Sequence, residues 1–102
     1  MDLTVLAVPG CPNAPLLERR LGEALGRRPG ETVRRRLITG AAEAARWGMH
    51  GSPTLLVNGH DPFAAPGGAP ALACRLYRGE DGRLAGAPTV EALRRVLAEA
   101  DP

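Results

Sequence analysis

The stretch that most constrains this chain runs from Trp47 to Val57, with the sequence Trp-Gly-Met-His-Gly-Ser-Pro-Thr-Leu-Leu-Val. Its pattern is typical of a helix end, a tight loop, a proline and a short buried strand over 54–57 that stops at an Asn-Gly turn signal. The glycines allow backbone angles that other residues resist. Ser52-Pro53 is an X-Pro bond, the type of peptide bond in which the cis form costs little. The stretch therefore predicts a defined loop that enters a core strand.

Composition limits the classes of protein to consider. The chain has 102 residues, of which 44% are hydrophobic, and is predicted to form one domain over residues 1–102. All 13 basic residues are arginine, which is typical of a GC-rich genome, and the net charge of +2 is too small to indicate nucleic-acid binding. The sequence contains no long apolar run and no signal-peptide pattern, so we expect a cytoplasmic protein without membrane association. In that reducing compartment its two cysteines indicate catalysis or metal binding, or are incidental.

Periodicity and turn signals predict the element order β-α-β-α-β-β-α. Strands are expected over 3–8, 32–38, 54–57 and 72–78, with a short extended piece over 83–86. Helices are expected from Pro12 to Pro29-Gly30, over 41–47, and after a Thr89 cap. The first two strands, joined by a helix, should pair in parallel, and the last strands should pair antiparallel. The predicted fold class is α/β, with a mixed sheet flanked by helices.

Two segments of this pattern have particular features. Three consecutive arginines, Arg34 to Arg36, indicate that the second strand lies at a sheet edge, where charge discourages pairing with other chains. The segment 60–71, rich in Pro, Gly and Ala, is a long loop for a domain of this size. Trp47 is expected in the core.

The Trp47 stretch and the element order resemble the thioredoxin superfamily. Its members carry an aromatic-Gly-aliphatic-basic-Gly-x-Pro-Thr-aliphatic run, and this chain matches it in order at Trp47, Gly48, Met49, His50, Gly51, Pro53 and Thr54. The resemblance implies that the Ser52-Pro53 bond is cis and that Pro53 faces an active-site cysteine. It also implies that the proline loop offers backbone N–H and C=O groups to an extended substrate. The loop over 60–71 departs from the family, which has a tight hairpin there.

Cys11 is the candidate catalytic residue. It follows a predicted buried strand and lies in the first turn of a predicted helix, where unpaired N–H groups and the helix dipole stabilise a thiolate. In the thioredoxin family this position holds the attacking cysteine of a Cys-x-x-Cys motif, but here the motif reads Cys11-Pro12-Asn13-Ala14. Exchange between two cysteines of the motif is therefore excluded, and the chain resembles monothiol relatives. An inert thiol is the alternative.

Four residues are assigned to the substrate-binding site on the same resemblance: Pro12, His50, Ser52 and Pro53. Ser52 would lie near the Cys11 sulfur and hydrogen-bond to it. His50 replaces a basic residue of the family and would either support a thiolate as His⁺ or lie on the surface. A purely structural role for Pro53 is compatible with this assignment.

The role of Cys74 depends on the path of the chain after the strand over 54–57. If a simple hairpin follows, Cys74 lies at the end of the sheet remote from Cys11, and a disulfide, which needs Cα atoms within about 7 Å, is impossible. If the 60–71 loop instead returns to the active-site end, the strand over 72–78 descends from it and 83–86 becomes the last strand. Cys74 is then a resolving thiol or a second metal ligand. Otherwise it is a small apolar residue on a strand.

A narrower resemblance involves three runs: residues 51–59, Asp61-Pro62-Phe63 and Cys74-Arg75-Leu76-Tyr77. They are similar to those of small bacterial thioredoxin-like proteins, some of which are labelled alkylmercury lyases. Breaking a carbon–mercury bond by protonation needs two thiolates and an acid, for which Cys11, Cys74 and Asp61 are the candidates. On spacing alone, His60 and Asp61 form a solvated turn. Arg75 and Arg78 would bind an anionic partner if they face the site.

Three functions remain open from the sequence. The first is a thiol-dependent oxidoreductase in which Cys11 attacks, Pro53 holds the substrate, and Cys74 or a low-molecular-weight thiol resolves the mixed disulfide. Its partners would be a protein with a thiol or disulfide, or a small thiol, and it needs no cofactor and no resident metal. The second is a redox-inactive binding module, suggested by the loss of the second motif cysteine at Ala14. The third is soft-metal handling, with Cys11 and Cys74 as a pair of ligands for mercury or copper(I). The sequence does not determine an oligomeric state.

Overall fold

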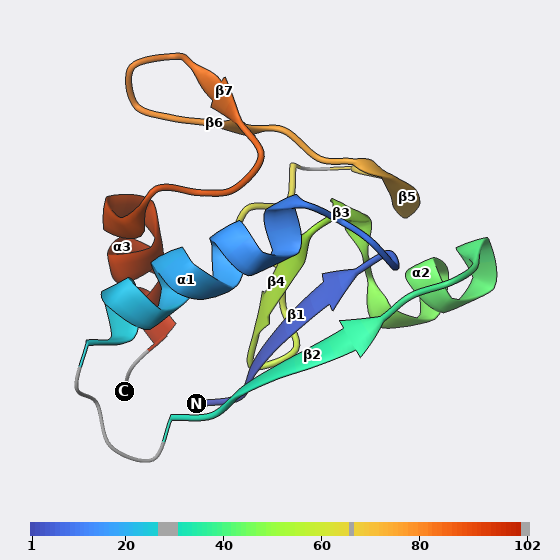
Figure 1. The fold of residues 1–102 in the computed structure, drawn as a ribbon, viewed down its shortest axis with the longest axis horizontal. Coiled ribbons are helices and arrows are strands. Elements are labelled where there is room, and N and C mark those ends of the chain that lie inside the picture. The colour runs from blue at the N-terminus through green and yellow to red at the C-terminus, as the bar shows by residue number, and fades with distance from the viewer. Residues whose placement is uncertain (27–30, 66, 101–102) are drawn as a thin grey trace.

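The structure is a computed structural model, and it describes residues 1–26, 31–65 and 67–100. Within these residues the chain is a mixed α/β protein with seven strands and three helices (Figure 1). The strands are β1 (Leu3–Ala7), β2 (Val33–Leu37), β3 (His50–Ser52), β4 (Thr54–Val57), β5 (Ala71–Cys74), β6 (Tyr77–Arg78) and β7 (Leu84–Ala85). The helices are α1 (Asn13–Leu25), α2 (Ala41–Trp47) and α3 (Val90–Ala100).

The central sheet of the described residues has three strands in the order β2-β1-β4. β1 pairs in parallel with β2, so that Leu3 lies opposite Val33, and it pairs antiparallel with β4, so that Leu3 also lies opposite Val57. β2 is an edge strand with three exposed arginines, which confirms the prediction from the Arg34–Arg36 run. β1 lies in the middle and is almost completely buried, as a continuous apolar run requires.

Helices cover both faces of this sheet. Successive side chains of a strand point to opposite faces. On one face, residues of β1 and β4 pack against α1 and α3 in a cluster that includes Leu3, Val5, Leu17, Leu21, Leu55, Leu93 and Leu97. On the other face, a smaller cluster involves α2 and comprises Leu6, Ile38, Ala44, Met49 and Leu56. The expected mixed sheet flanked by helices is therefore present over its first three strands.

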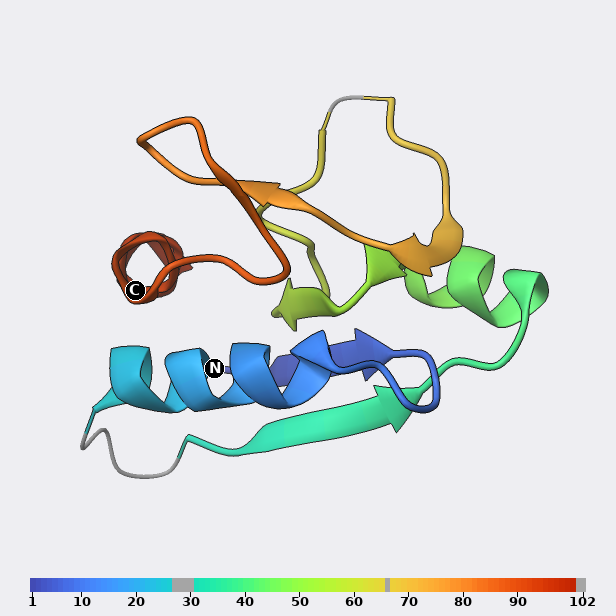
Figure 2. The same ribbon diagram turned by 45° about the horizontal axis from the view of Figure 1, so that its top comes forward.

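The second half of the chain departs from the predicted order. The expected strand over 72–78 is divided into β5, which pairs in parallel with β3, and β6, which forms a separate antiparallel pair with β7. The prediction that the last strands pair antiparallel is confirmed for β6 and β7, but this pair is separate from the central sheet. In Figure 2, β5 and β6 lie on the far side of β3 and β4 from β2. The long connection between β4 and β5 permits this parallel return, which a tight turn does not.

Gly51 explains how β3 and β5 come together. Its φ of +107° is a conformation that L side chains rarely adopt, and a Cβ there would lie 2.9 Å from the Cβ of Arg75. Only a glycine allows the two backbones to approach so closely at this point.

The helix boundaries agree with the sequence where they are described. α2 covers the predicted residues and ends at Gly48, whose φ is +72°. The Thr89 hydroxyl accepts a hydrogen bond of 3.0 Å from the Ala92 N–H, which confirms the predicted cap of α3. α1 ends at Leu25, and the predicted stop at Pro29-Gly30 lies outside the described residues. No helix in the described part of the chain combines the length and apolar character that crossing a bilayer requires.

Trp47 is not in the core, contrary to the prediction. Its ring is half-buried at the edge of the smaller cluster, and the Arg36 guanidinium lies 4.1 Å from the ring centroid. This position lets the indole pack on one side and contact a cation on the other.

Candidate functional site

Cys11 lies in the short connection between β1 and α1. Its N–H donates a 3.2 Å hydrogen bond to the Val8 carbonyl, and Pro12, which already has helical angles, separates it from the first residue of α1. Cys11 therefore precedes the helix by two residues, whereas the sequence placed it within the first turn. Its side chain is half-buried and not oxidised.

The proline loop is bonded to the segment just before Cys11. The Ser52-Pro53 peptide bond is cis, as the resemblance implied, and both residues are buried. The Ser52 hydroxyl accepts a 3.1 Å hydrogen bond from the N–H of Val8, the same residue whose carbonyl receives the Cys11 N–H. Ser52 thus links the loop to the backbone that positions Cys11, and the expected hydrogen bond to the sulfur is replaced by one to this backbone.

Cys74 lies at the same end of the molecule as Cys11. It ends β5, and in the parallel pairing of β3 with β5 it lies opposite Ser52. The simple-hairpin path, which would have carried Cys74 to the remote end, is therefore wrong, and the long loop does return to this end. Cys74 is an exposed free thiol. A chain of direct contacts, from Cys74 through Ser52 and Val8, connects it with Cys11.

The backbone acceptors of the proline loop are occupied by the chain itself. The Arg75 N–H donates a 3.0 Å hydrogen bond to the Ser52 carbonyl, and the Tyr77 hydroxyl donates one of 2.5 Å to the Pro53 carbonyl. The resemblance implied that this loop is open to an extended substrate. Here residues 74–77 lie along it instead.

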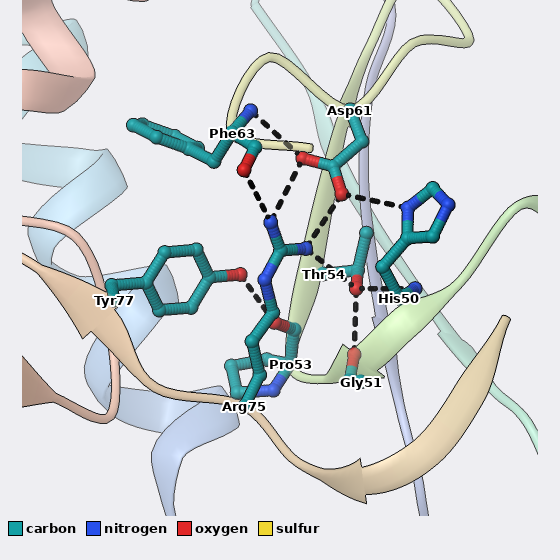
Figure 3. Close-up of polar contacts among 8 residues, drawn as sticks. All are labelled: His50, Gly51, Pro53, Thr54, Asp61, Phe63, Arg75 and Tyr77. Atoms are coloured by element: carbon teal, nitrogen blue, oxygen red, sulfur yellow. Dashed lines mark hydrogen bonds and ion pairs between the residues drawn. The ribbon is translucent and has the colours of Figure 1, made fainter. Parts of the chain in front are cut away.

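A buried ion pair holds this segment in place (Figure 3). The Arg75 guanidinium lies 2.6 Å from Asp61, and their side chains are only 10% and 2% exposed. Arg75 also donates to the Phe63 carbonyl at 2.8 Å and to the Thr54 hydroxyl at 3.2 Å. The prediction that Asp61 belongs to a solvated turn is wrong. Its carboxylate is buried and joins the loop that follows β4 to Arg75, the residue after β5. Arg75 is committed to this pair and is not available for the anionic partner that the sequence suggested.

His50 belongs to the same network. Its Nδ1 lies 3.1 Å from Asp61 Oδ2, the same oxygen that Arg75 contacts at 2.6 Å, and its backbone N–H lies 3.3 Å from the Thr54 hydroxyl. The imidazole is thus bonded to Asp61, whereas the sequence assigned it to the substrate-binding site beside the thiolate. Pro12 is exposed next to Cys11, and His60 is exposed in the turn after β4.

Tyr77 is a site residue to which the sequence assigned no role. Its ring meets Phe63 edge to face, with centroids 5.6 Å apart, and Arg75 lies over it at 4.5 Å. Burial raises the pKa of the Tyr77 hydroxyl, Arg75 lowers it, and the negative charges of Asp61 and Cys11 raise it further. The signal in the sequence was a tyrosine in a strand pattern, whose hydroxyl needs a partner when buried.

The described residues contain no group of three or more His, Cys, Asp or Glu side chains placed to hold a metal ion.

Comparisons with protein-family models, with curated proteins and with solved structures gave no match to this chain.

Proposed function

We propose that this protein is a thiol-dependent oxidoreductase with a thioredoxin-like fold, in which Cys11 is the nucleophile and Cys74 the resolving thiol. The observation that carries the proposal is the chain of contacts from Cys74 through Ser52 and Val8 to Cys11. Two free cysteines, 63 positions apart in the printed sequence, lie at the same end of the molecule beside the proline loop. The thioredoxin-like assignment is supported by the β1-α1-β2 parallel unit and by β4 pairing antiparallel to β1.

The reaction proceeds by two thiol–disulfide exchanges. The Cys11 thiolate attacks one sulfur of a substrate disulfide, which forms a mixed disulfide and releases the other substrate sulfur as a thiolate. The Cys74 thiolate then attacks the Cys11 sulfur, which forms a Cys11–Cys74 bond and releases the second substrate sulfur. The substrate gains two electrons and two protons, and the two protein thiols lose them. Two molecules of a low-molecular-weight thiol return the protein to its reduced form in two further exchanges, and they leave as their own disulfide.

The structure suggests how residues 74–77 take part. No bond joins the two sulfurs in this structure, so forming one requires Cys11 and the exposed Cys74, at the end of β5, to approach each other. The residues that follow Cys74 are held in place, because Arg75 pairs with Asp61 and the Tyr77 hydroxyl donates to the Pro53 carbonyl. Any movement of Cys74 is therefore confined to a short segment.

The test is intact-mass spectrometry after treatment with 2-hydroxyethyl disulfide, on the wild type and on Cys11→Ser and Cys74→Ser. The wild type should form an internal disulfide, and Cys74→Ser should accumulate a mixed disulfide at Cys11. Cys11→Ser should react at Cys74 only as fast as an exposed cysteine in a short peptide. If Cys11 stays unmodified in all three proteins, the proposal fails.

A redox-inactive binding module is the second candidate. It is favoured by Ala14, which replaces the second cysteine of the motif. In that case Cys11→Ser would retain every activity that a deletion of the protein abolishes.

A further inference from the structure

A cavity of about 720 Å³ is lined in part by Arg75 and Tyr77 of the network beside the proline loop. Its walls are the loop after β4, the hairpin of β6 and β7, and the start of α3, with Arg20 of α1 completing the rim. Among the described residues that line it are neither Cys11 nor Cys74. Its volume lies within the range of about 300–1,000 Å³ that is typical of sites for small molecules.

The interior of the cavity is largely apolar. Phe63 and Tyr77, packed edge to face, contribute aromatic surface, and Leu76 is 62% exposed. Six small apolar residues also line it: Ala65, Ala69, Ala85, Ala87, Pro88 and Ala92. An exposed leucine next to aromatic rings is a surface that an apolar ligand would cover.

The rim of the cavity is positively charged. The described lining residues include five arginines and two acidic residues, a formal excess of +3, whereas the whole chain carries only +2. Three of the arginines have acidic partners: Arg75 pairs with Asp61, Arg83 with Asp81 and Arg95 with Glu80. Two do not.

Arg20 and Arg78 are the two arginines whose charge has no acidic partner among the described residues. The Nη1 of Arg20 donates to the carbonyls of Ala87 and Pro88, at 3.1 and 3.2 Å, and the Nη1 of Arg78 donates to that of Gly82 at 3.1 Å. Backbone carbonyls orient a guanidinium without neutralising it, and each side chain keeps further N–H donors. Arg20 is in addition half-buried, so its charge is less screened by solvent.

We propose that this cavity binds a small amphipathic organic anion, with an apolar or aromatic body against Phe63 and Leu76 and an acid group on Arg20. The apolar wall supplies affinity, and the unneutralised guanidinium supplies selectivity for a carboxylate or sulfonate. The proposal does not depend on the chemistry of Cys11, since the two sites have no cysteine in common.

The test uses two fluorescent probes that differ in charge. 8-Anilinonaphthalene-1-sulfonate is anionic, and N-phenyl-1-naphthylamine has the same rings without the acid group. The anionic probe should bind with a stoichiometry of one, and decanoate should displace it while decanol at the same concentration should not. Arg20→Gln should raise the dissociation constant of the anionic probe about tenfold, because one charge-assisted contact is lost, and should leave that of the neutral probe unchanged.

The control is Arg94→Gln, an exposed arginine of α3 that is not among the described residues lining the cavity. Because Arg20 also bonds the chain before α3, circular dichroism should confirm that its variant is folded. If the Arg20→Gln variant is not folded, Arg78→Gln on the exposed hairpin replaces it. This variant should also weaken binding of the anionic probe and leave binding of the neutral probe unchanged. Equal binding of both probes, unaffected by either arginine, would show an apolar docking surface instead. No binding of either probe would exclude a ligand site.

Discussion

The buried carboxylate of Asp61 is expected to contribute strongly to the stability of the fold. It accepts from Arg75, from the Phe63 N–H at 2.9 Å, and contacts His50, and its side chain is 2% exposed. Removing one partner of a buried pair leaves the other charge uncompensated. We therefore expect Asp61→Asn to lower the free energy of unfolding by about 3–5 kcal/mol, measured by urea denaturation.

The matched control for Asp61 is Asp81→Asn. Asp81 also pairs with an arginine, Arg83, but at 3.7 Å and with side chains 62% and 89% exposed. Exposed pairs contribute at most about 1 kcal/mol, so this variant should be nearly as stable as the wild type. If Asp61→Asn lowered the free energy of unfolding as little as Asp81→Asn does, Asp61 would be exposed to solvent in solution.

Tyr77 predicts a pH dependence of stability at high pH. Burial raises the pKa of its hydroxyl above the value of about 10 that it has in an unfolded chain. The folded state therefore favours the protonated form, whose contribution to stability is complete below pH 10 and is lost as the pH rises above it. The unfolding free energy should fall as the pH rises above about 10, and Tyr77→Phe should reduce that fall. The same slope in both proteins would assign the effect to other groups.

At the scale of elements, the pairing of β3 with β5 depends on Gly51. A Cβ at this position would meet the Cβ of Arg75 at 2.9 Å and the Ala73 carbonyl at 3.1 Å, at a φ of +107°. Gly51→Ala should therefore separate the two strands and lower the melting temperature by roughly 8 °C or more, which corresponds to about 2 kcal/mol for a domain of this size.

Gly22→Ala is the control for this strand pairing. Gly22 lies within α1 with nothing within 4 Å of an added Cβ, so alanine should stabilise the helix by about 0.5–1 kcal/mol. Opposite signs for the two substitutions would support the close approach of β3 and β5. A neutral Gly51→Ala would contradict it.

The elements that the sequence predicted well are those with a local signal. β1 is a continuous apolar run, α2 ends at a glycine, and Thr89 is a good cap, so each was predicted from its own residues. The division of residues 72–78 into β5 and β6 has no such signal. It depends on Arg75, which reaches a carboxylate 14 positions earlier in the chain, and that contact exists only in the folded molecule.

At the scale of the whole molecule, the candidate site was predictable in part. Cys11 was identified from its place between a predicted strand and a predicted helix, and Ser52-Pro53 from the run over 47–57. The structure links them through Val8. Whether Cys74 lay near them could not be decided, because two chain paths fitted the same pattern. Tyr77 received no role and Asp61 was placed in solvent, since burial of a polar side chain is a property of the assembled fold.

The central core and the outer segment over residues 71–85 are held by different kinds of contact. β1, β4, α1 and α3 share a large buried cluster, whereas residues 71–85 are tied to the rest mainly by β3 pairing, by Arg75 and by Tyr77. Segments with few buried apolar contacts open at lower free energy than the core. Arg75→Leu should therefore release this outer segment and leave the core folded.

Hydrogen exchange read by mass spectrometry tests this division. In Arg75→Leu, protection of the amides over 71–85 should fall about tenfold or more, while amides of β1, β4 and α1 should keep most of theirs. Arg83→Leu, which changes an arginine that is 89% exposed in the same segment, should leave both regions unchanged. A uniform loss of protection across the chain would instead show that residues 71–85 and the central sheet unfold as one unit, with the ion pair of Asp61 and Arg75 as part of a single core.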